Sequence, residues 1–275
     1  MRIAITGSKG QLGQALQACF EHDQLLLVDL PEFDITNLQD MLLSMRSFAP
    51  AVIIHAAAMT DVDGCERAPD LAYRINVAGT RNLAVAAQEI GCPLVYISTD
   101  YVFDGAKGQP YWEYDDTNPQ SVYARTKWVG EQIVRQLVPK HYIVRIAWLY
   151  GQGPRNFPRT VLRLARERGQ LTMVTDEIGS PTSAADVSAA LERLIQIPAY
   201  GTYHLPNTGA CSRYEWALHI LELAGIQGVL VTPSTDYQRA AQVPKHVELY
   251  NFMGAEIGIV MRPWQEALRD YISAG

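Results

Sequence analysis

The chain has 275 residues, of which 48% are apolar and 19% are charged, as in ordinary globular proteins. Its 23 basic and 29 acidic residues give a net charge of −6, which argues against a nucleic-acid partner. No apolar run approaches the ~20 residues that a membrane-spanning helix needs, and the N-terminus predicts a strand rather than a signal peptide. Four cysteines without a CxxC spacing fit a reduced cytoplasmic protein.

A glycine-rich turn follows the first predicted strand, residues 2–6, and precedes a helix that runs to about residue 20. Its pattern is Gly-x-x-Gly-x-x-Gly. The first glycine permits a tight turn, the second lets a pyrophosphate approach the backbone, and the third lets the helix pack close to the strand. Because the pattern stands between a strand and a helix, it predicts dinucleotide binding. The residues expected to bind are Gly7, Gly10, Gln11, Leu12 and Gly13.

Asp29 ends a second predicted strand, residues 25–28, where an acidic side chain can bind the adenosine ribose hydroxyls. No basic residue lies between Asp29 and Arg46 to hold a 2′-phosphate. The sequence therefore favours NADH over NADPH, with both kept as candidate cofactors. Asp34, followed by Ile35, either faces the adenine or caps a helix that begins near residue 37.

Small residues follow a third predicted strand, residues 51–54, and allow the cofactor to lie against the backbone. We expect Ala57, Ala58 and Thr60 to border it. His55, at the end of this strand, is interpreted as a structural residue outside the mechanism. Asn76 lies in a predicted helix over residues 71–90 and either bridges to backbone near the active site or faces the helix surface.

A fourth predicted strand, residues 94–97, leads to Thr99, and a loop rich in glycine, proline and acids leads on to Tyr123 and Lys127. A tyrosine and a lysine four residues apart lie on one face of a helix. The phenol has an ordinary pKa of about 10, and an adjacent ammonium favours the phenolate. With the Thr99 hydroxyl on a substrate carbonyl, these side chains predict a proton-transfer site.

The alternation of strands and helices predicts an α/β fold with a doubly wound parallel sheet and right-handed crossovers. We expect residues 1–150 to form a dinucleotide-binding domain, with returning segments near 171–200. Residues 151–275 are expected to form mainly a smaller α/β substrate-binding part.

Six stretches carry a family resemblance, and the most telling is Ser98-Thr99-Asp100-Tyr101-Val102-Phe103. The full set is residues 7–13, 56–63, 98–105, 123–127, 145–151 and 262–268. On these motifs, which span nearly the whole chain, the sequence resembles the Rossmann-type extended short-chain dehydrogenases/reductases. Within that superfamily it is similar to the dTDP-4-dehydrorhamnose reductase family.

The resemblance implies NAD(P)H-dependent reduction of the 4-keto group of a nucleotide-linked 6-deoxyhexose. In that mechanism Tyr123 donates a proton, Lys127 holds the nicotinamide ribose and lowers the tyrosine pKa, and Thr99 binds the carbonyl. The substrate-binding residues are then Thr99, Asp100, Trp148 and Asn156. Arginines in the predicted helix 159–168 are either a solvated face or a diphosphate site. The resemblance also allows a homodimer and a bound Mg²⁺ ion, for which the sequence shows no ligand pattern.

One segment departs from the family pattern, which has Arg-Pro, a hydroxyl residue and Leu-Asp-Asn before the C-terminal helix. Residues 243–251 lack the arginine, the hydroxyl and the aspartate, and Lys245 is the candidate replacement for the lost charge. The exact sugar nucleotide is therefore open. Two alternatives are an epimerase or dehydratase, disfavoured because Tyr101 stands where a dehydratase has glutamate, and a non-catalytic nucleotide-binding regulatory subunit.

Overall fold

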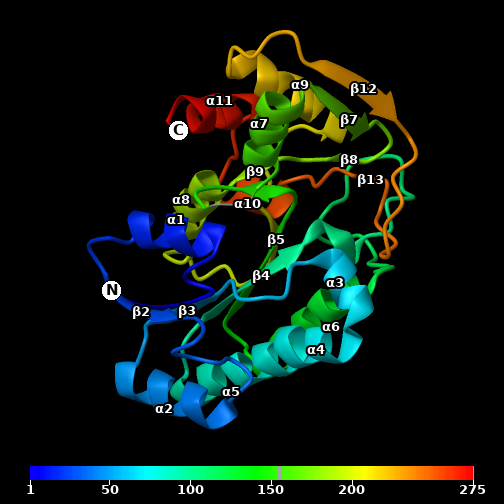
Figure 1. Ribbon diagram of the computed structural model, residues 1–275. Helices are drawn as coiled ribbons and strands as arrows, with labels where there is room; N and C mark the ends of the chain where they lie inside the picture. Colours follow the sequence, from blue (N-terminus) through cyan, green and yellow to red (C-terminus); the bar gives the residue numbers. More distant parts are fainter. Residues whose placement is uncertain (154–155, 275) are drawn as a thin grey trace.

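The centre of the protein is a six-stranded parallel sheet with the order β10-β5-β4-β3-β1-β2 (Figure 1). This computed structural model describes residues 1–153 and 156–274. The strands are β1 (Arg2–Thr6), β2 (Gln24–Val28), β3 (Val52–His55), β4 (Leu94–Thr99), β5 (His141–Ile146) and β10 (Gly201–His204). The chain moves outward from β1 to β2 and then builds β3, β4 and β5 on the other side. The reversal at β1 and β3 creates the crevice where doubly wound sheets bind ligands, so the predicted fold class is confirmed.

Helices cover both faces of this sheet (Figure 1). On one face, α1 (Gln11–Cys19) and α8 (Ala184–Leu194) pack against each other and on Ile3 and Ile5. The opposite face, which includes Ala4, carries α2 (Leu38–Phe48), α5 (Thr80–Ile90) and α6 (Val122–Leu137). Successive residues of a strand point to opposite faces, and here both faces are buried, so the strands are apolar throughout.

The predicted helix over residues 71–90 is divided into three pieces. After α3 (Val62–Arg67), the chain forms α4 (Pro69–Tyr73), a π-helical segment η1 (Arg74–Gly79) and then α5. Asn76 lies in the π-helical segment, where its Oδ1 accepts a hydrogen bond from Met59 N at 2.8 Å and its Nδ2 donates to Thr126 Oγ1 at 2.9 Å. Of the two roles considered for Asn76, the structure confirms the backbone bridge. It ties the segment after β3 to α6.

The second half of the chain adds a further layer with its own core around Val161, Trp216 and Trp264. Its main elements are α7 (Phe157–Arg168), β7 (Gln170–Val174), α9 (Arg213–Leu223), β12 (Leu230–Ser234) and α11 (Trp264–Ser273). Figure 1 shows this layer on the side of the main sheet that carries α1 and α8, away from α2 and α5. Short elements connect it: η2 (Asp100–Val102), β6 (Leu149–Tyr150), β8 (Ile178–Gly179), β9 (Thr182–Ser183), β11 (Cys211–Ser212), β13 (His246–Val247) and α10 (Phe252–Glu256). The division into domains at residue 150 stays a prediction.

Within the described residues, the helices are all too short or too polar to span a bilayer. The four cysteines are free thiols.

Candidate active site

The glycine turn between β1 and α1 leaves no room for side chains. Gly7 has φ +68°, and a Cβ there would lie 2.8 Å from Ala57 Cα. A Cβ on Gly13 would lie 2.2 Å from the Gly7 carbonyl oxygen. Helix α1 begins at Gln11 with no acidic residue in its first turn and no side-chain cap. Its first N–H groups can therefore receive an anion, and the turn fits a dinucleotide diphosphate.

At the far end of this crevice, Asp29 is flanked by Lys9. The Lys9 backbone N–H donates to Asp29 Oδ2 at 2.8 Å, and Lys9 Nζ pairs with Glu32 at 2.8 Å. A cavity of about 440 Å³ borders all three residues. The sequence argument against a 2′-phosphate considered only bases that follow Asp29, whereas the structure brings Lys9 beside Asp29 from the glycine turn, 20 residues earlier. The preference for NADH over NADPH stays a prediction.

The neighbouring candidates have local roles. Asp34 Oδ1 accepts from Thr36 N at 2.9 Å, and α2 is capped by Asn37 rather than by Asp34. Ile35 is buried in the core under α2 and α5. These contacts show a turn-forming residue and a core residue, whereas contact with the adenine stays a prediction.

The segment after β3 starts against the glycine turn. Ala57 N donates to Thr6 Oγ1 at 3.2 Å, and Ala58 and Thr60 follow on the path to α3. His55 is fully buried between the Thr6 and Thr80 hydroxyls, at 2.7 and 3.0 Å. Burial lowers the pKa of His55 to about 3, so the ring is neutral at physiological pH. Its interpretation as a structural residue is confirmed.

Thr99 and Tyr123 meet at the carboxyl end of β4. Thr99 is the last residue of that strand, and Tyr123 lies in the first turn of α6, which Ser121 caps. Burial raises the pKa of Tyr123, and a hydrogen bond with the Thr99 side chain acts in the opposite direction. The ring of Tyr101 packs edge-on against that of Tyr123, with centroids 5.9 Å apart. A phenol with a raised pKa carries its proton at neutral pH but is a weaker acid than a free phenol.

Lys127 lies one helical turn after Tyr123 and is 4% exposed. Its Nζ lies 4.1 Å from the ring centroid of Tyr96 on β4. Burial lowers the pKa of Lys127 to about 7, and the charge of Glu131 opposes that change. The expectation that Lys127 lowers the pKa of Tyr123 is not met in this structure. Desolvation of the phenol and the charge of Asp100 raise the pKa of Tyr123 by more than the Thr99 hydrogen bond lowers it.

Trp148 sits in a strained conformation at the end of β5, with φ +44°. A Cβ on Gly179 would lie 2.6 Å from its indole, so glycine makes room for the ring. The Cζ atom of Arg213 lies 3.4 Å from the Trp148 ring centroid. Arg213 was not singled out in the sequence analysis. The feature that could have indicated it is its place as the first residue of α9, directly after the Ser212 cap. A stacked tryptophan and guanidinium can hold a planar or anionic group.

Asp100 interacts with both Thr99 and Arg213. It is 3% exposed, and Thr99 Oγ1 donates to its Oδ1 at 2.9 Å. Burial raises the pKa of Asp100 to about 7, while Thr99 and the positive charge of Arg213 lower it. Asp100 therefore contacts Thr99 directly and feels the positive charge of Arg213.

Asn156 has a capping role. Its Oδ1 accepts from Arg159 N at 2.9 Å, and its Nδ2 donates to Gly151 O at 2.7 Å and to Tyr271 Oη at 2.9 Å. Both amide hydrogens are thus engaged, one with the backbone directly after β6 and one with the C-terminal helix α11, and not with the Thr99–Tyr123 cluster. Arg163, in the same helix, pairs with Glu167 on the exposed surface at 2.8 Å. The geometry favours the solvated-face interpretation for that arginine.

Residues 243–251, which depart from the family pattern, contribute β13 to a small three-stranded sheet with the order β11-β8-β13. Its strand β8 carries Gly179, which lies against Trp148. Lys245 is tied to Asp176 at 2.9 Å and is not a free charge. Glu177 is shared by Arg213 at 3.7 Å and Arg239 at 3.6 Å. A cavity of about 370 Å³ is bordered by Glu177, Arg239 and Lys245. Two basic residues therefore border this cavity: Lys245, which the motif comparison considered, and Arg239, which it did not.

In the described part of the chain, no group of three or more histidine, cysteine, aspartate or glutamate side chains is placed to hold a metal ion.

Comparisons with known proteins agree over the full length. A family model described as the RmlD substrate binding domain matches residues 1–275. The chain belongs to the dTDP-4-dehydrorhamnose reductase family. The crystal structure of a member from Clostridium acetobutylicum is 43% identical, with a TM-score of 0.96, and covers 100% of this chain and 99% of its own.

A second member of the family, from Bacillus anthracis, was solved in complex with NADP. It is 41% identical, with the same coverage and a TM-score of 0.96. The spore coat polysaccharide biosynthesis protein SpsK of Bacillus subtilis is 36% identical over 277 residues, which cover 98% of this chain and 96% of that protein.

Proposed function

We propose that this protein reduces the 4-keto group of a nucleotide-linked 6-deoxyhexose with NADH or NADPH, converting dTDP-4-dehydro-L-rhamnose to dTDP-L-rhamnose. The observation that carries the proposal is the Thr99–Tyr123 contact at the carboxyl end of β4, with Lys127 one turn along the same helix. The names of the two similar crystal structures support the sugar nucleotide, and the NADP complex of one of them supports the cofactor.

The glycine turn fits the cofactor, because side chains are excluded at Gly7 and Gly13 and the first N–H groups of α1 are available. We assign the diphosphate to residues 7–13, the adenosine ribose to Asp29 and Lys9, and the nicotinamide ribose to Tyr123 and Lys127. Ala57, Ala58 and Thr60 border the cofactor in this proposal. When bound, the reduced nicotinamide supplies the hydride.

The chain's own residues then manage the proton. Tyr123 is protonated at neutral pH, since burial raises its pKa, and its Oη donates the proton to the oxygen of the reduced carbonyl. The single hydrogen of the Thr99 hydroxyl, which lies on Asp100 Oδ1 at 2.9 Å in this structure, turns to that oxygen when substrate binds, and the new hydrogen bond orients it. The ammonium of Lys127 holds a hydroxyl of the nicotinamide ribose and stabilises the negative charge that forms on Tyr123. Most of the acceleration comes from this placement in a site from which water is excluded.

On the substrate side, Arg213 and Trp148 stack on each other and form one wall, and the charge of Arg213 acts on Asp100. We assign the nucleotide end of the substrate to this wall and to the cavity beside Glu177 and Arg239. The capping hydrogen bonds of Asn156 leave its predicted contact with substrate without support from the geometry.

A cytoplasmic location and a homodimer are part of the proposal. The free cysteines support a reducing compartment. Analytical ultracentrifugation tests the dimer, for which a single species of monomer mass would be the contrary result.

The stoichiometry of the reaction tests the function. A reductase consumes one equivalent of reduced nicotinamide for each keto sugar converted, and the product is dTDP-L-rhamnose by NMR. An epimerase converts sugar without net consumption of the reduced cofactor. A regulatory subunit binds dinucleotide and converts nothing.

A further inference from the structure

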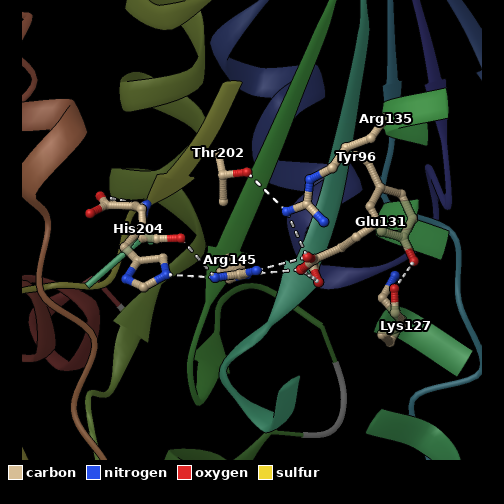
Figure 2. Close-up of polar contacts among 9 residues, drawn as sticks. Tyr96, Lys127, Glu131, Arg135, Arg145, Thr202 and His204 are labelled. Atoms are coloured by element: carbon tan, nitrogen blue, oxygen red, sulfur yellow. Dashed lines mark hydrogen bonds and ion pairs between the residues drawn. The ribbon is translucent and has the colours of Figure 1, made fainter. Parts of the chain in front are cut away.

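A fully buried carboxylate, Glu131, lies at the centre of a network of hydrogen bonds behind the candidate active site (Figure 2). Its Oε1 accepts from Ser98 Oγ at 2.7 Å and from Arg145 Nε at 2.9 Å. Its Oε2 accepts from Arg145 Nη2 at 2.8 Å and from Arg135 Nη2 at 3.1 Å. The bidentate pair with Arg145 is almost entirely withdrawn from water, with 0% and 2% of the side chains exposed.

The partners of Glu131 lie on the elements that carry the reaction. Ser98 precedes Thr99 on β4, and Lys127 lies one turn before Glu131 on α6. Arg145 on β5 extends the network, since its Nη1 donates to His204 Nε2 at 3.3 Å. Figure 2 shows Glu131 between Arg145 and Lys127, with the Tyr96 ring beside Lys127.

We propose that Glu131 is a positioning residue of the reductase site, whose carboxylate keeps Lys127 charged and fixes the end of β4 that carries Thr99. The catalytic part of this inference rests on the proposed function. The four hydrogen bonds of Glu131 and its ion pair with Arg145 are observed independently of that function.

Among the titratable groups around Lys127, Glu131 is the one whose negative charge stabilises the ammonium. The titratable groups that face Lys127 are Tyr123 and Glu131 on its own helix, Tyr96 on β4 and His55 on β3. Burial keeps the histidine and both tyrosines uncharged, since it lowers the pKa of His55 to about 3 and raises the pKa of the two phenols. Glu131 keeps its charge, because Arg145, Ser98 and Arg135 lower its pKa against the desolvation. A negative charge one turn away favours the ammonium form of Lys127.

A merely structural role for Glu131 predicts loss of stability and nothing specific to Lys127. Glu131→Gln alone leaves Arg145 buried without its counter-ion, which destabilises proteins strongly. The double variant Glu131→Gln/Arg145→Met removes both charges and keeps an acceptor for Ser98, so it is expected to fold. Arg135→Gln is the matched control, since it removes a partner at the outer edge of the network.

The test is a pH titration of the lysine side chains by NMR, in protein labelled with ¹³C at the lysine ε-carbon. The chain has only five lysines, and Lys127→Arg identifies the signal. We expect Lys127 to titrate near pH 7 in the wild type and in Arg135→Gln. In the double variant its midpoint falls by about one pH unit, as expected for loss of a neighbouring opposite charge. An unchanged midpoint in the folded double variant overturns the proposal.

The enzymatic arm measures kcat/KM against pH with the keto sugar. Above pH 8 the double variant is expected to lose about tenfold relative to Arg135→Gln, because a titration midpoint lower by about one pH unit leaves about a tenth as much Lys127 charged. Equal pH profiles overturn the catalytic meaning of the inference. A wild-type protein that does not turn over the sugar contradicts the proposed function, while the NMR titration still decides the role of Glu131.

Discussion

Lys9 and Asp29 are joined by a hydrogen bond from the Lys9 backbone N–H to Asp29 Oδ2 at 2.8 Å. In the proposed cofactor site, the Asp29 carboxylate is the partner of ribose hydroxyls and the Lys9 ammonium is the partner of a 2′-phosphate. Glu32 competes for the same ammonium at 2.8 Å. NADH and NADPH would therefore meet opposite charges at neighbouring positions.

Lys9→Ala is expected to raise KM for NADPH by about five- to tenfold and to change KM for NADH less than twofold. The physical reason is loss of one charge-assisted hydrogen bond to the phosphate, weakened by exposure to solvent. Glu32→Gln frees Lys9 and lowers KM for NADPH. Steady-state kinetics with both cofactors check this, with the exposed Lys140→Ala as control. Equal effects on the two cofactors would show that Lys9 does not read the phosphate.

Gly13→Ala is expected to abolish dinucleotide binding. Its Cβ would lie 2.2 Å from the Gly7 carbonyl oxygen, so the turn must open and the α1 N–H groups move away from the diphosphate. Gly225→Ala is the control: its φ of +64° costs about 1–2 kcal/mol, but its Cβ meets open space. Quenching of protein fluorescence by NADPH measures binding. Tight binding by Gly13→Ala would contradict the assignment of the turn.

Lys127→Met is expected to unfold at a higher temperature than the wild type at pH 6. The folded pKa of Lys127, about 7, lies below its unfolded value near 10.5, so burying the charge destabilises the fold. That cost is fully present below pH 7 and disappears as the pH rises toward 10.5. At pH 6 the variant gains about 2–4 kcal/mol, and at pH 9 much less.

Calorimetry at the two pH values checks this sign. A stability gain that is equal at pH 6 and pH 9 would mean that packing, not charge, is responsible. The same variant is expected to lose reductase activity, because in the proposed mechanism the Lys127 ammonium holds the nicotinamide ribose.

Arg262→Gln is expected to destabilise the protein by about 1–2 kcal/mol. Arg262 donates from Nε and Nη2 to the two carboxylate oxygens of Asp186, each at 2.9 Å, and so joins α8 to the segment before α11. Arg163→Gln, which removes an exposed pair on one helix, is the control and changes stability by less than about 0.5 kcal/mol. Denaturation in urea measures both, and equal effects would contradict the assignment.

The parts of the site that depend on local spacing could be predicted from the sequence. The glycine turn and the Tyr123–Lys127 pair each lie within a few residues of chain, where strand and helix geometry fixes the neighbours. Lys9 and Arg213 could not be assigned, because their partners Asp29 and Trp148 come from other elements and only the folded chain brings them together. The pKa of Tyr123 was predicted in the wrong direction, since burial of the phenol cannot be read from the spacing of the pair.

The boundaries of helices and strands could likewise be predicted where local sequence sets them, and not where distant residues do. Predicted strands agree with the structure within a few residues, as for the strand predicted over residues 94–97, which the structure has as β4 (Leu94–Thr99). The helix over residues 71–90 did not, because the hydrogen bonds of Asn76 to Met59 and Thr126 stabilise a π-helical segment within it. Those partners lie 17 and 50 residues away.

The most direct test of the account is the rate of oxidation of NADPH with dTDP-4-dehydro-L-rhamnose, measured for the wild type and for Tyr123→Phe. Removing the proton donor is expected to lower kcat by about 10²–10⁴-fold while the affinity for NADPH stays within about threefold. The exposed Tyr73→Phe is expected to match the wild type. Turnover by Tyr123→Phe at the wild-type rate would contradict the assignment of the proton donor. A wild-type protein that binds NADPH and leaves it unoxidised would contradict the reductase.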